Sequence, residues 1–288
     1  YIRAEGGALR LTIRGYKGIC AAAALSALAL LIGAIVCFPV VYAVMGAFKP
    51  RAEFAVLPPE LLPQSFLYIE NFIHALTRAP LVRFMLNSVI VSAMGCAIRI
   101  VFAALAAYAF AYYKFPGKGI LFGAVLATMM LPADTLIVTN YLTVSRMNLL
   151  DNYFGMIITS LVGATQMFML RQCFRTIPPS LRDAAFIDGC GDLRYLTRIA
   201  LPVARPVVLT LMVQSFCTFW NMYLWPLLIT NRTAMRTVQV GITMLTNPLD
   251  PNHGLVMAAV SIILIPSFVL FIFLRRSIAR GVSLGSLV

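Results

Sequence analysis

The charged residues that could take part in chemistry gather in one short segment of this sequence, LRDAAFIDGCGDLRYLTRIALP, which runs from Leu181 to Pro202. The segment carries three Arg and three Asp in 22 positions, whereas charged residues make up 11% of the chain and hydrophobic residues 61%. Catalysis would also need a nucleophile beside a base, or a metal-binding cluster, and the sequence has neither pattern. We therefore predict a docking surface, with no catalytic or metal-binding residues.

The sequence contains no nucleotide-binding loop of the form G-x-x-x-x-G-K-[ST], so we expect the chain alone to bind no ATP and no other cofactor. Its two histidines, His74 and His253, are expected to be loop residues. The six cysteines show no metal-binding spacing and are expected to be small apolar side chains.

The charged segment should fold as two short helices. Pro179 suits the first turn of a helix, and Ser180 with Asp183 resembles a capping box. Leu181, Ala184 and Ala185 recur at helical spacing and give this first helix a small apolar face. Asp188-Gly189 should end it, because glycine accepts the left-handed conformation.

Asp192 can cap the second helix, which Pro202 should end near the membrane. An amphipathic loop lying on the bilayer is the alternative. The three aspartates disfavour anionic headgroups and the apolar face is small, so a protein partner fits better.

The elements that hold this segment are apolar runs long enough to cross a bilayer as helices. We predict an all-α integral membrane protein with six transmembrane helices and a kink at Pro132. The six spans are 18–47, 84–112, 119–145, 152–174, 204–230 and 255–274.

The net charge of +13 indicates orientation and no nucleic-acid partner. Fifteen of the 23 Lys and Arg fall inside, and seven outside, if both termini are cytoplasmic. The predicted organisation is a cytoplasmic segment 1–17, a transmembrane domain 18–274 that contains a cytoplasmic loop 175–203, and a cytoplasmic tail 275–288.

The charged segment resembles the EAA loop of ABC-importer permease subunits. Three residues separate Asp183-Ala184-Ala185 from Gly189, and nine more lead to Ile199-Ala200-Leu201-Pro202, as in that family. Asp183 stands where the family usually has Glu. WNMYLWPLL from Trp220 and RTVQVG from Arg236 look like the maltose-type carbohydrate-uptake permeases. The tail departs from that subfamily, because it lacks the usual Lys-Gly ending.

The resemblance implies the type I ABC-importer permease fold, placed in a bacterial inner membrane with contact to lipid. It also implies that Asp183, Ala184, Ala185, Asp188 and Gly189 form a coupling helix that docks on a homodimeric ATPase, where ATP and Mg bind. The other implied partners are a second homologous permease and an extracytoplasmic solute-binding protein.

Two charges fall within predicted spans. A charge at mid-membrane costs roughly 2.5–3.5 kcal/mol on insertion scales, so it normally faces protein or water. At 1.5 Å per residue, Arg99 and Asp134 would lie about 20 Å and about 22 Å from the inner face, where an ion pair can form. Alternatively, Arg99 lines the route of an anionic solute, as the similar glycerol-3-phosphate importers suggest.

Asn221 and Tyr223 are further candidates for the solute route, because aromatic and amide groups suit polyol recognition. Interfacial anchoring and helix packing are the alternative for this segment and its tryptophans. The solute is expected to be glycerol-3-phosphate or a glycerophosphodiester, with a neutral oligosaccharide as runner-up. An ion-coupled secondary transporter is the rival of another class, but only Asp134 offers it a midplane carboxylate.

Overall fold

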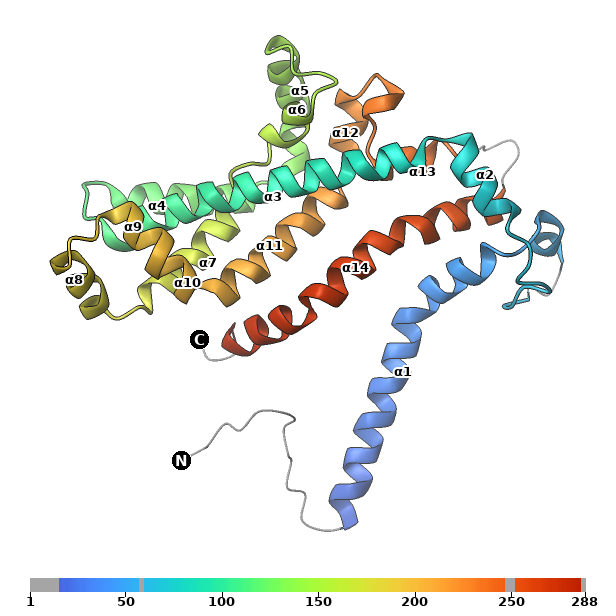
Figure 1. Ribbon diagram of the computed structural model, residues 1–288, viewed down its shortest axis with the longest axis horizontal. Coiled ribbons are helices and arrows are strands. Elements are labelled where there is room, and N and C mark those ends of the chain that lie inside the picture. The colour runs from blue at the N-terminus through green and yellow to red at the C-terminus, as the bar shows by residue number, and fades with distance from the viewer. Residues whose placement is uncertain (1–15, 57–59, 247–251, 286–288) are drawn as a thin grey trace.

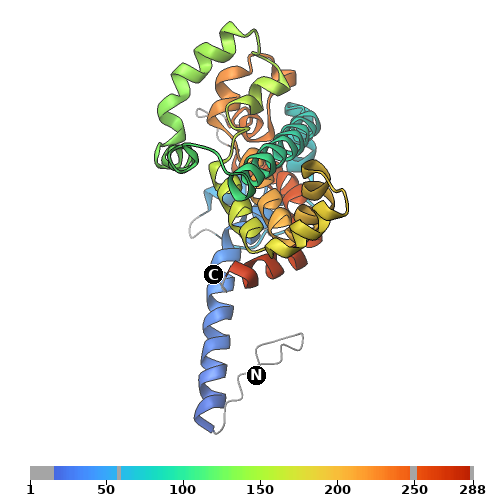
Figure 2. The ribbon, with the colours of Figure 1, turned by 90° about the vertical axis from the view of Figure 1, so that its left-hand side faces the viewer.

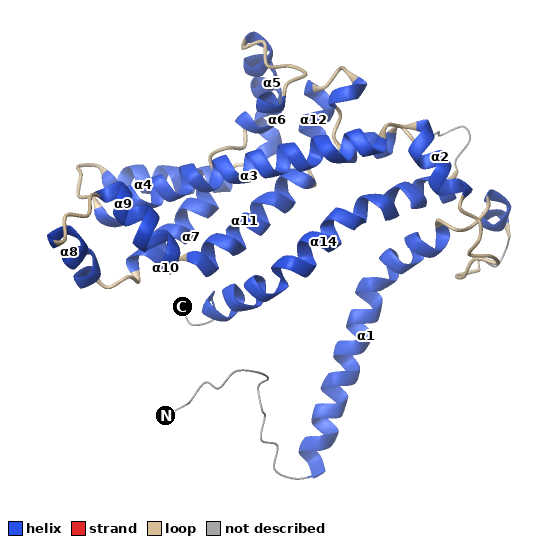
Figure 3. Ribbon diagram, viewed as in Figure 1, coloured by secondary structure: helices blue, strands red, loops and turns tan. Residues whose placement is uncertain are grey.

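The computed structural model describes residues 16–56, 60–246 and 252–285, and within these ranges every regular element is a helix (Figure 3). The long helix α3 (Leu81–Tyr112) packs against both α7 (Ala164–Arg175) and α11 (Arg205–Trp220), which lie side by side along it (Figure 1). The predicted span 84–112 is therefore one continuous helix. Small residues of α3, such as Ala103 and Ala107, are buried and let the neighbouring helices approach closely.

The first and last helices lie at the edge of this bundle. α14 (His253–Gly285) packs on α11, and the C-terminal end of α1 (Tyr16–Gly46) packs on α14, while the beginning of α1 projects from the body of the molecule (Figures 1 and 2). None of the apolar window in Ala23–Gly46 is buried, whereas 44% of that in α3 is. Such an exposed apolar helix needs lipid or another subunit around it.

Three of the predicted spans are broken. The span 119–145 consists of α4 (Lys118–Ala127), 3₁₀ turns at Thr128–Met130 and Ala133–Leu136, and α5 (Ile137–Arg146). The break falls at Pro132, where a kink was predicted, because proline cannot donate a helical hydrogen bond.

The span 152–174 divides into α6 (Tyr153–Ile158) and α7, and 204–230 into α11 and α12 (Leu224–Ile229). α5, α6 and α12 form a lobe at the side of α3 (Figure 1). Asp151 joins the lobe, since its Oδ1 accepts the backbone N–H of Asn231 and of Arg232, each at 2.8 Å.

Two described helices, Ala23–Gly46 and Leu81–Tyr112, are long and apolar enough to cross a membrane. A third crossing is counted if Asp192–Val203 and Arg205–Trp220, bent by 85°, form one span. The number of six spans stays a prediction.

The two ends of α3 carry different short helices. α2 (Glu70–Arg78) and α13 (Val238–Thr243) lie at the end where α3 begins (Figure 1). The opposite end carries α8 (Pro179–Ile187), α9 (Asp192–Tyr195), a π turn (Leu196–Ala200) and α10 (Leu201–Val203). This second end holds the charged segment. The predicted segment 1–17 lies almost entirely outside the described residues, whereas the backbone of α14 stays helical to Gly285.

Candidate coupling site and candidate solute route

The first helix of the charged segment, α8, ends where the sequence predicts but begins differently. Gly189 has φ +76°, and the N–H of Cys190 donates to the carbonyl of Ala185 at 2.9 Å, which closes the helix. The predicted capping box is wrong, because Pro178 is the N-cap and no side chain caps the helix. Ser180 thus lies inside the first turn, too late to act as the cap.

The small apolar face of α8 is divided between the body and the outside. Ala185 is buried and packs in the cluster that fills the space between α3, α7 and α11. Asp183, Ala184, Asp188 and Gly189 are exposed, as are Leu181 (41%) and Ile187 (86%). The exposed side of α8 therefore includes Ala184 and Ile187, together with Asp183 and Asp188.

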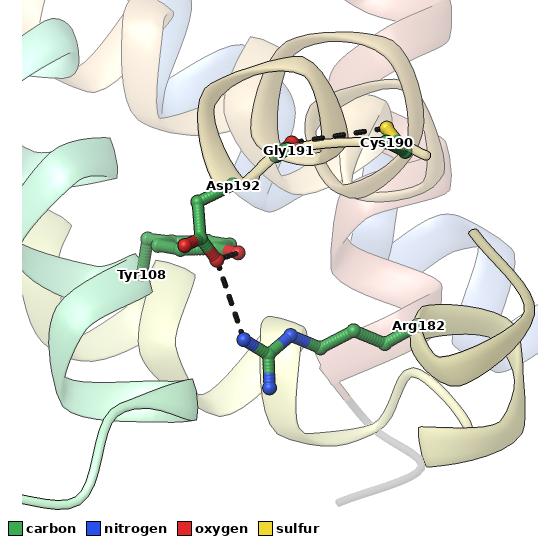
Figure 4. A network of polar contacts seen from close by, with 5 residues as sticks. All are labelled: Tyr108, Arg182, Cys190, Gly191 and Asp192. Atoms are coloured by element: carbon green, nitrogen blue, oxygen red, sulfur yellow. Dashed lines mark hydrogen bonds and ion pairs between the residues drawn. The ribbon is translucent and has the colours of Figure 1, made fainter. Parts of the chain in front are cut away.

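The sequence suggested that Asp192 caps the second helix, and this is wrong. Gly191 occupies the N-cap position of α9, and Asp192 is the first residue of the helix. The Asp192 carboxylate instead reaches a residue 84 positions away. Its Oδ1 accepts a hydrogen bond from the Tyr108 hydroxyl at 2.5 Å and pairs with Arg182 Nη2 at 3.3 Å (Figure 4). The Arg182 guanidinium also lies over the Tyr112 and Phe186 rings, 5.1 and 4.8 Å from their centroids.

The pKa of Asp192 is lowered from its ordinary value of 3.8, mainly by the hydrogen bond from Tyr108, with Tyr113 and Arg182 adding to the effect against partial burial. A depressed carboxyl pKa contributes stability that is present above the unfolded-state pKa and lost as pH falls through the folded pKa. We expect the melting-temperature difference between the purified protein and its Asp192→Asn variant to be constant from about pH 8 to about pH 5 and to shrink below about pH 4. A difference that changes between pH 6 and pH 8 would contradict this assignment.

Arg99, the buried cation of α3, is 7% exposed. Its Nε donates to the Ser160 carbonyl at 2.8 Å, and its Nη2 donates to the same oxygen. Its guanidinium carbon lies 4.4 Å from the centroid of the Phe219 ring. Ser160 belongs to the break between α6 and α7, so Arg99 satisfies a carbonyl that the helix has released.

The other route candidates lie on different elements. Asn221 is the C-cap of α11 and accepts at Oδ1 a long hydrogen bond of 3.5 Å from Gln239 Nε2. Tyr223 is the N-cap of α12 and 42% exposed. Phe219, two residues before Asn221, brings this segment beside Arg99. The Asp134 side chain lies outside the described residues, and with it the predicted Arg99–Asp134 pair.

The two tryptophans of this segment are packed inside the protein. Trp220 is 4% and Trp225 is 9% exposed, and Trp225 Nε1 donates to the Gly155 carbonyl at 3.2 Å. Their burial is evidence for the helix packing that was predicted as the alternative for this segment.

Several residues of these sites were not found from the sequence. Tyr108, Arg182, Ser160 and Phe219 gave no local signal, because their partners are distant in the chain. Gly95 is another: a Cβ on it would lie 2.6 Å from Phe219 Cζ. The one sign in the sequence that another helix packs closely here was Gly95 itself, one helical turn before Arg99.

A family model for the inner membrane component of binding-protein-dependent transport systems matches residues 99–284. The chain belongs to this family. Such a component is a permease, so the resemblance to ABC-importer permeases of carbohydrate uptake is confirmed. The exposed side of α8 and the broken spans are therefore features of a transport subunit of an inner membrane.

Curated relatives of this permease family share about a third of the aligned residues with the chain. The sn-glycerol-3-phosphate transport system permease protein UgpE of Yersinia pestis bv. Antiqua (strain Antiqua) is 33% identical over 260 residues, which cover 88% of this chain and 92% of UgpE. The arabinooligosaccharides transport system permease protein AraQ of Halalkalibacterium halodurans is 29% identical over 253 residues, which cover 87% and 91%.

Solved structures show the same fold at lower identity. A bacterial ABC transporter involved in the import of the acidic polysaccharide alginate matches with a TM-score of 0.81 and 19% identity over 92% of this chain and 98% of that chain. The same kind of transporter, solved with an alginate pentasaccharide-bound periplasmic protein, matches with a TM-score of 0.62 and 17% identity over 92% and 99%. The helical fold of an ABC-importer permease is thereby confirmed, while the number of six spans stays a prediction.

Proposed function

We propose that this chain is one of two permease subunits of an ATP-driven importer, and that it moves glycerol-3-phosphate or a glycerophosphodiester into the cytoplasm. The observation that carries the proposal is α8, a short exposed helix at the end of the bundle, in a chain 33% identical to a glycerol-3-phosphate permease. A separate homodimeric ATPase binds ATP and Mg and receives α8 in a groove. Both termini then lie in the cytoplasm.

The exposed side of α8 supports the docking. Ala184 lets a groove approach closely, Ile187 supplies an apolar anchor, and Asp183 and Asp188 fit basic residues at the rim. Closure of the ATPase dimer moves α8, and the spans open in turn to the outside and to the cytoplasm. The chain itself does no covalent chemistry.

Arg99 supports an anionic solute. Its described hydrogen bonds use Nε and Nη2, and a guanidinium has five N–H donors, so it retains capacity for a phosphate. Asn221 and Tyr223 follow Phe219 in the chain and would line the same route. Asp134, which follows the break at Pro132, is assigned to the same route.

The solute is first captured by an extracytoplasmic binding protein, and a second, homologous permease completes the pore. A periplasmic protein accompanies the alginate transporter in one of the similar structures. The exposed α1 offers an apolar surface for lipid and for the second permease.

A neutral oligosaccharide is the second candidate solute, favoured by the 29% identity to the arabinooligosaccharide permease AraQ. Uptake into proteoliposomes that contain the permease pair, the ATPase and the binding protein separates the candidates. We expect ATP-dependent uptake of glycerol-3-phosphate or glycerophosphocholine and none of arabino-oligosaccharides. The opposite pattern assigns the sugar, and uptake driven by a proton or sodium gradient without the ATPase assigns a secondary transporter.

A further inference from the structure

The coupling helix α8 is joined to the rest of the chain by few contacts. Ala185 is its one described residue that is buried. The covalent connection to α9 passes through Gly189 and Gly191, and a Cβ added to either would meet nothing within 4 Å. Glycines in open space bend easily, so this connection alone transmits movement poorly.

Arg182 supplies the charged contact of α8 with the rest of the chain, beside the apolar contacts of Ala185 and Phe186. It pairs with Asp192 and lies over the ring of Tyr112, the last residue of α3. The Tyr112 hydroxyl in turn donates to the Phe174 carbonyl of α7 at 2.9 Å. Arg182 is therefore connected through Tyr112 to both α3 and α7, and a displacement of Arg182 would act on both helices.

Asp192 brings three elements together at one atom. Its Oδ1 accepts hydrogen bonds from Tyr108 of α3 and from Arg182 of α8, and Asp192 is itself the first residue of α9 (Figure 4). Tyr108 is 5% exposed and lies within the apolar cluster around α3, so its hydroxyl is held firmly in place. Hydrogen bonds to a charged group are among the stronger ones in proteins.

We infer that Tyr108, Arg182 and Asp192 form a clamp that carries the movement of α8 into α3. The inference rests on the proposed function, because it assumes that an ATPase moves α8. The three are positioning residues: they touch neither nucleotide nor solute, and they act by making α8 and α3 move as one unit. Without the clamp, α8 can follow the ATPase by bending at the two glycines while α3 stays behind.

The test uses the complete importer in proteoliposomes, with ATP hydrolysis and solute uptake measured on the same sample. Tyr108→Phe, Arg182→Gln and Asp192→Asn should leave complex assembly and hydrolysis within about twofold of wild type and lower uptake about fivefold or more, so that less solute moves per ATP. Arg182→Lys keeps the positive charge, so it should recover part of the amount of solute moved per ATP. Arg194→Gln changes an exposed arginine of α9 and is the control. It should leave the amount of solute moved per ATP at the wild-type value.

Tyr108→Phe combined with Asp192→Ala should be no worse than Asp192→Ala alone, since either change removes the hydrogen bond between Tyr108 and Asp192. Wild-type solute per ATP in all three single variants would overturn the clamp and leave the proposed function intact. A loss of assembly that matches the loss of uptake would also overturn it, because the residues would then serve folding only. An unmodified chain that neither binds an ATPase nor takes up solute on ATP would instead reject the proposed function.

Discussion

Replacing Arg99 with alanine is expected to lower the initial rate of glycerol-3-phosphate uptake about tenfold or more. The change removes a buried cation, releases the Ser160 carbonyl from its charged partner and uncovers the Phe219 ring. Hydrogen bonds to charged groups contribute about 1.5–3 kcal/mol each, so a loss of this size is reasonable. The measurement is uptake by the reconstituted importer, with the melting temperature determined in parallel.

Arg83 provides a matched control on the same helix. Its Nε also donates to a backbone carbonyl, that of Ala234, at 2.8 Å, but the Arg83 side chain is exposed. Arg83→Ala should therefore change uptake by less than about twofold. Unchanged uptake in Arg99→Ala would remove Arg99 from the route, and a drop in melting temperature that accounts for the whole loss would assign it a structural role alone.

Gly95→Ala is expected to destabilise the packing of α3 on α11 by about 1–3 kcal/mol, the usual range for overpacking. The new Cβ would lie 2.6 Å from Cζ of Phe219, whose ring is 2% exposed and has little room to move. Because the same ring covers Arg99, the substitution should also lower uptake. Thermal unfolding of the purified permease measures the first effect.

Gly123→Ala is the control, since it lies in α4 with nothing within 4 Å of its Cβ position and should be neutral or slightly stabilising. Phe219→Leu should relieve the clash, so the double variant Gly95→Ala/Phe219→Leu should be more stable than the sum of the single changes. Strict additivity would show that the two residues do not compete for space.

The breaks in the predicted spans show how this fold pairs backbone groups that its helices release. Released carbonyls are costly in hydrocarbon unless protein or water receives them. Arg99 supplies donors for Ser160, and Trp225 supplies one for Gly155. These partners come from α3 and α12, so each break depends on helices that lie elsewhere in the chain. The breaks also give the permease irregular backbone beside Arg99, where the solute route is proposed.

Local features of the sequence were enough to determine the helical class, the continuous span of α3, the kink at Pro132 and the turn at Gly189. Each rests on a property of a residue or a short run: apolar length, the missing N–H of proline, or the positive φ that glycine tolerates. The prediction of a docking surface rests on a local pattern as well, because the EAA-like spacing lies within one segment.

Only the tertiary structure decided which alanine of α8 faces inward, what Asp192 binds and where Arg99 points. Ala185 is buried while Ala184 is exposed, although both belong to one predicted face. Asp192 accepts a hydrogen bond from Tyr108, 84 residues away in the chain, and Arg99 donates one to Ser160, 61 residues away. Helix propensity and capping act over a few residues, whereas these contacts form when helices distant in sequence pack together, so the packing overrides the local preference.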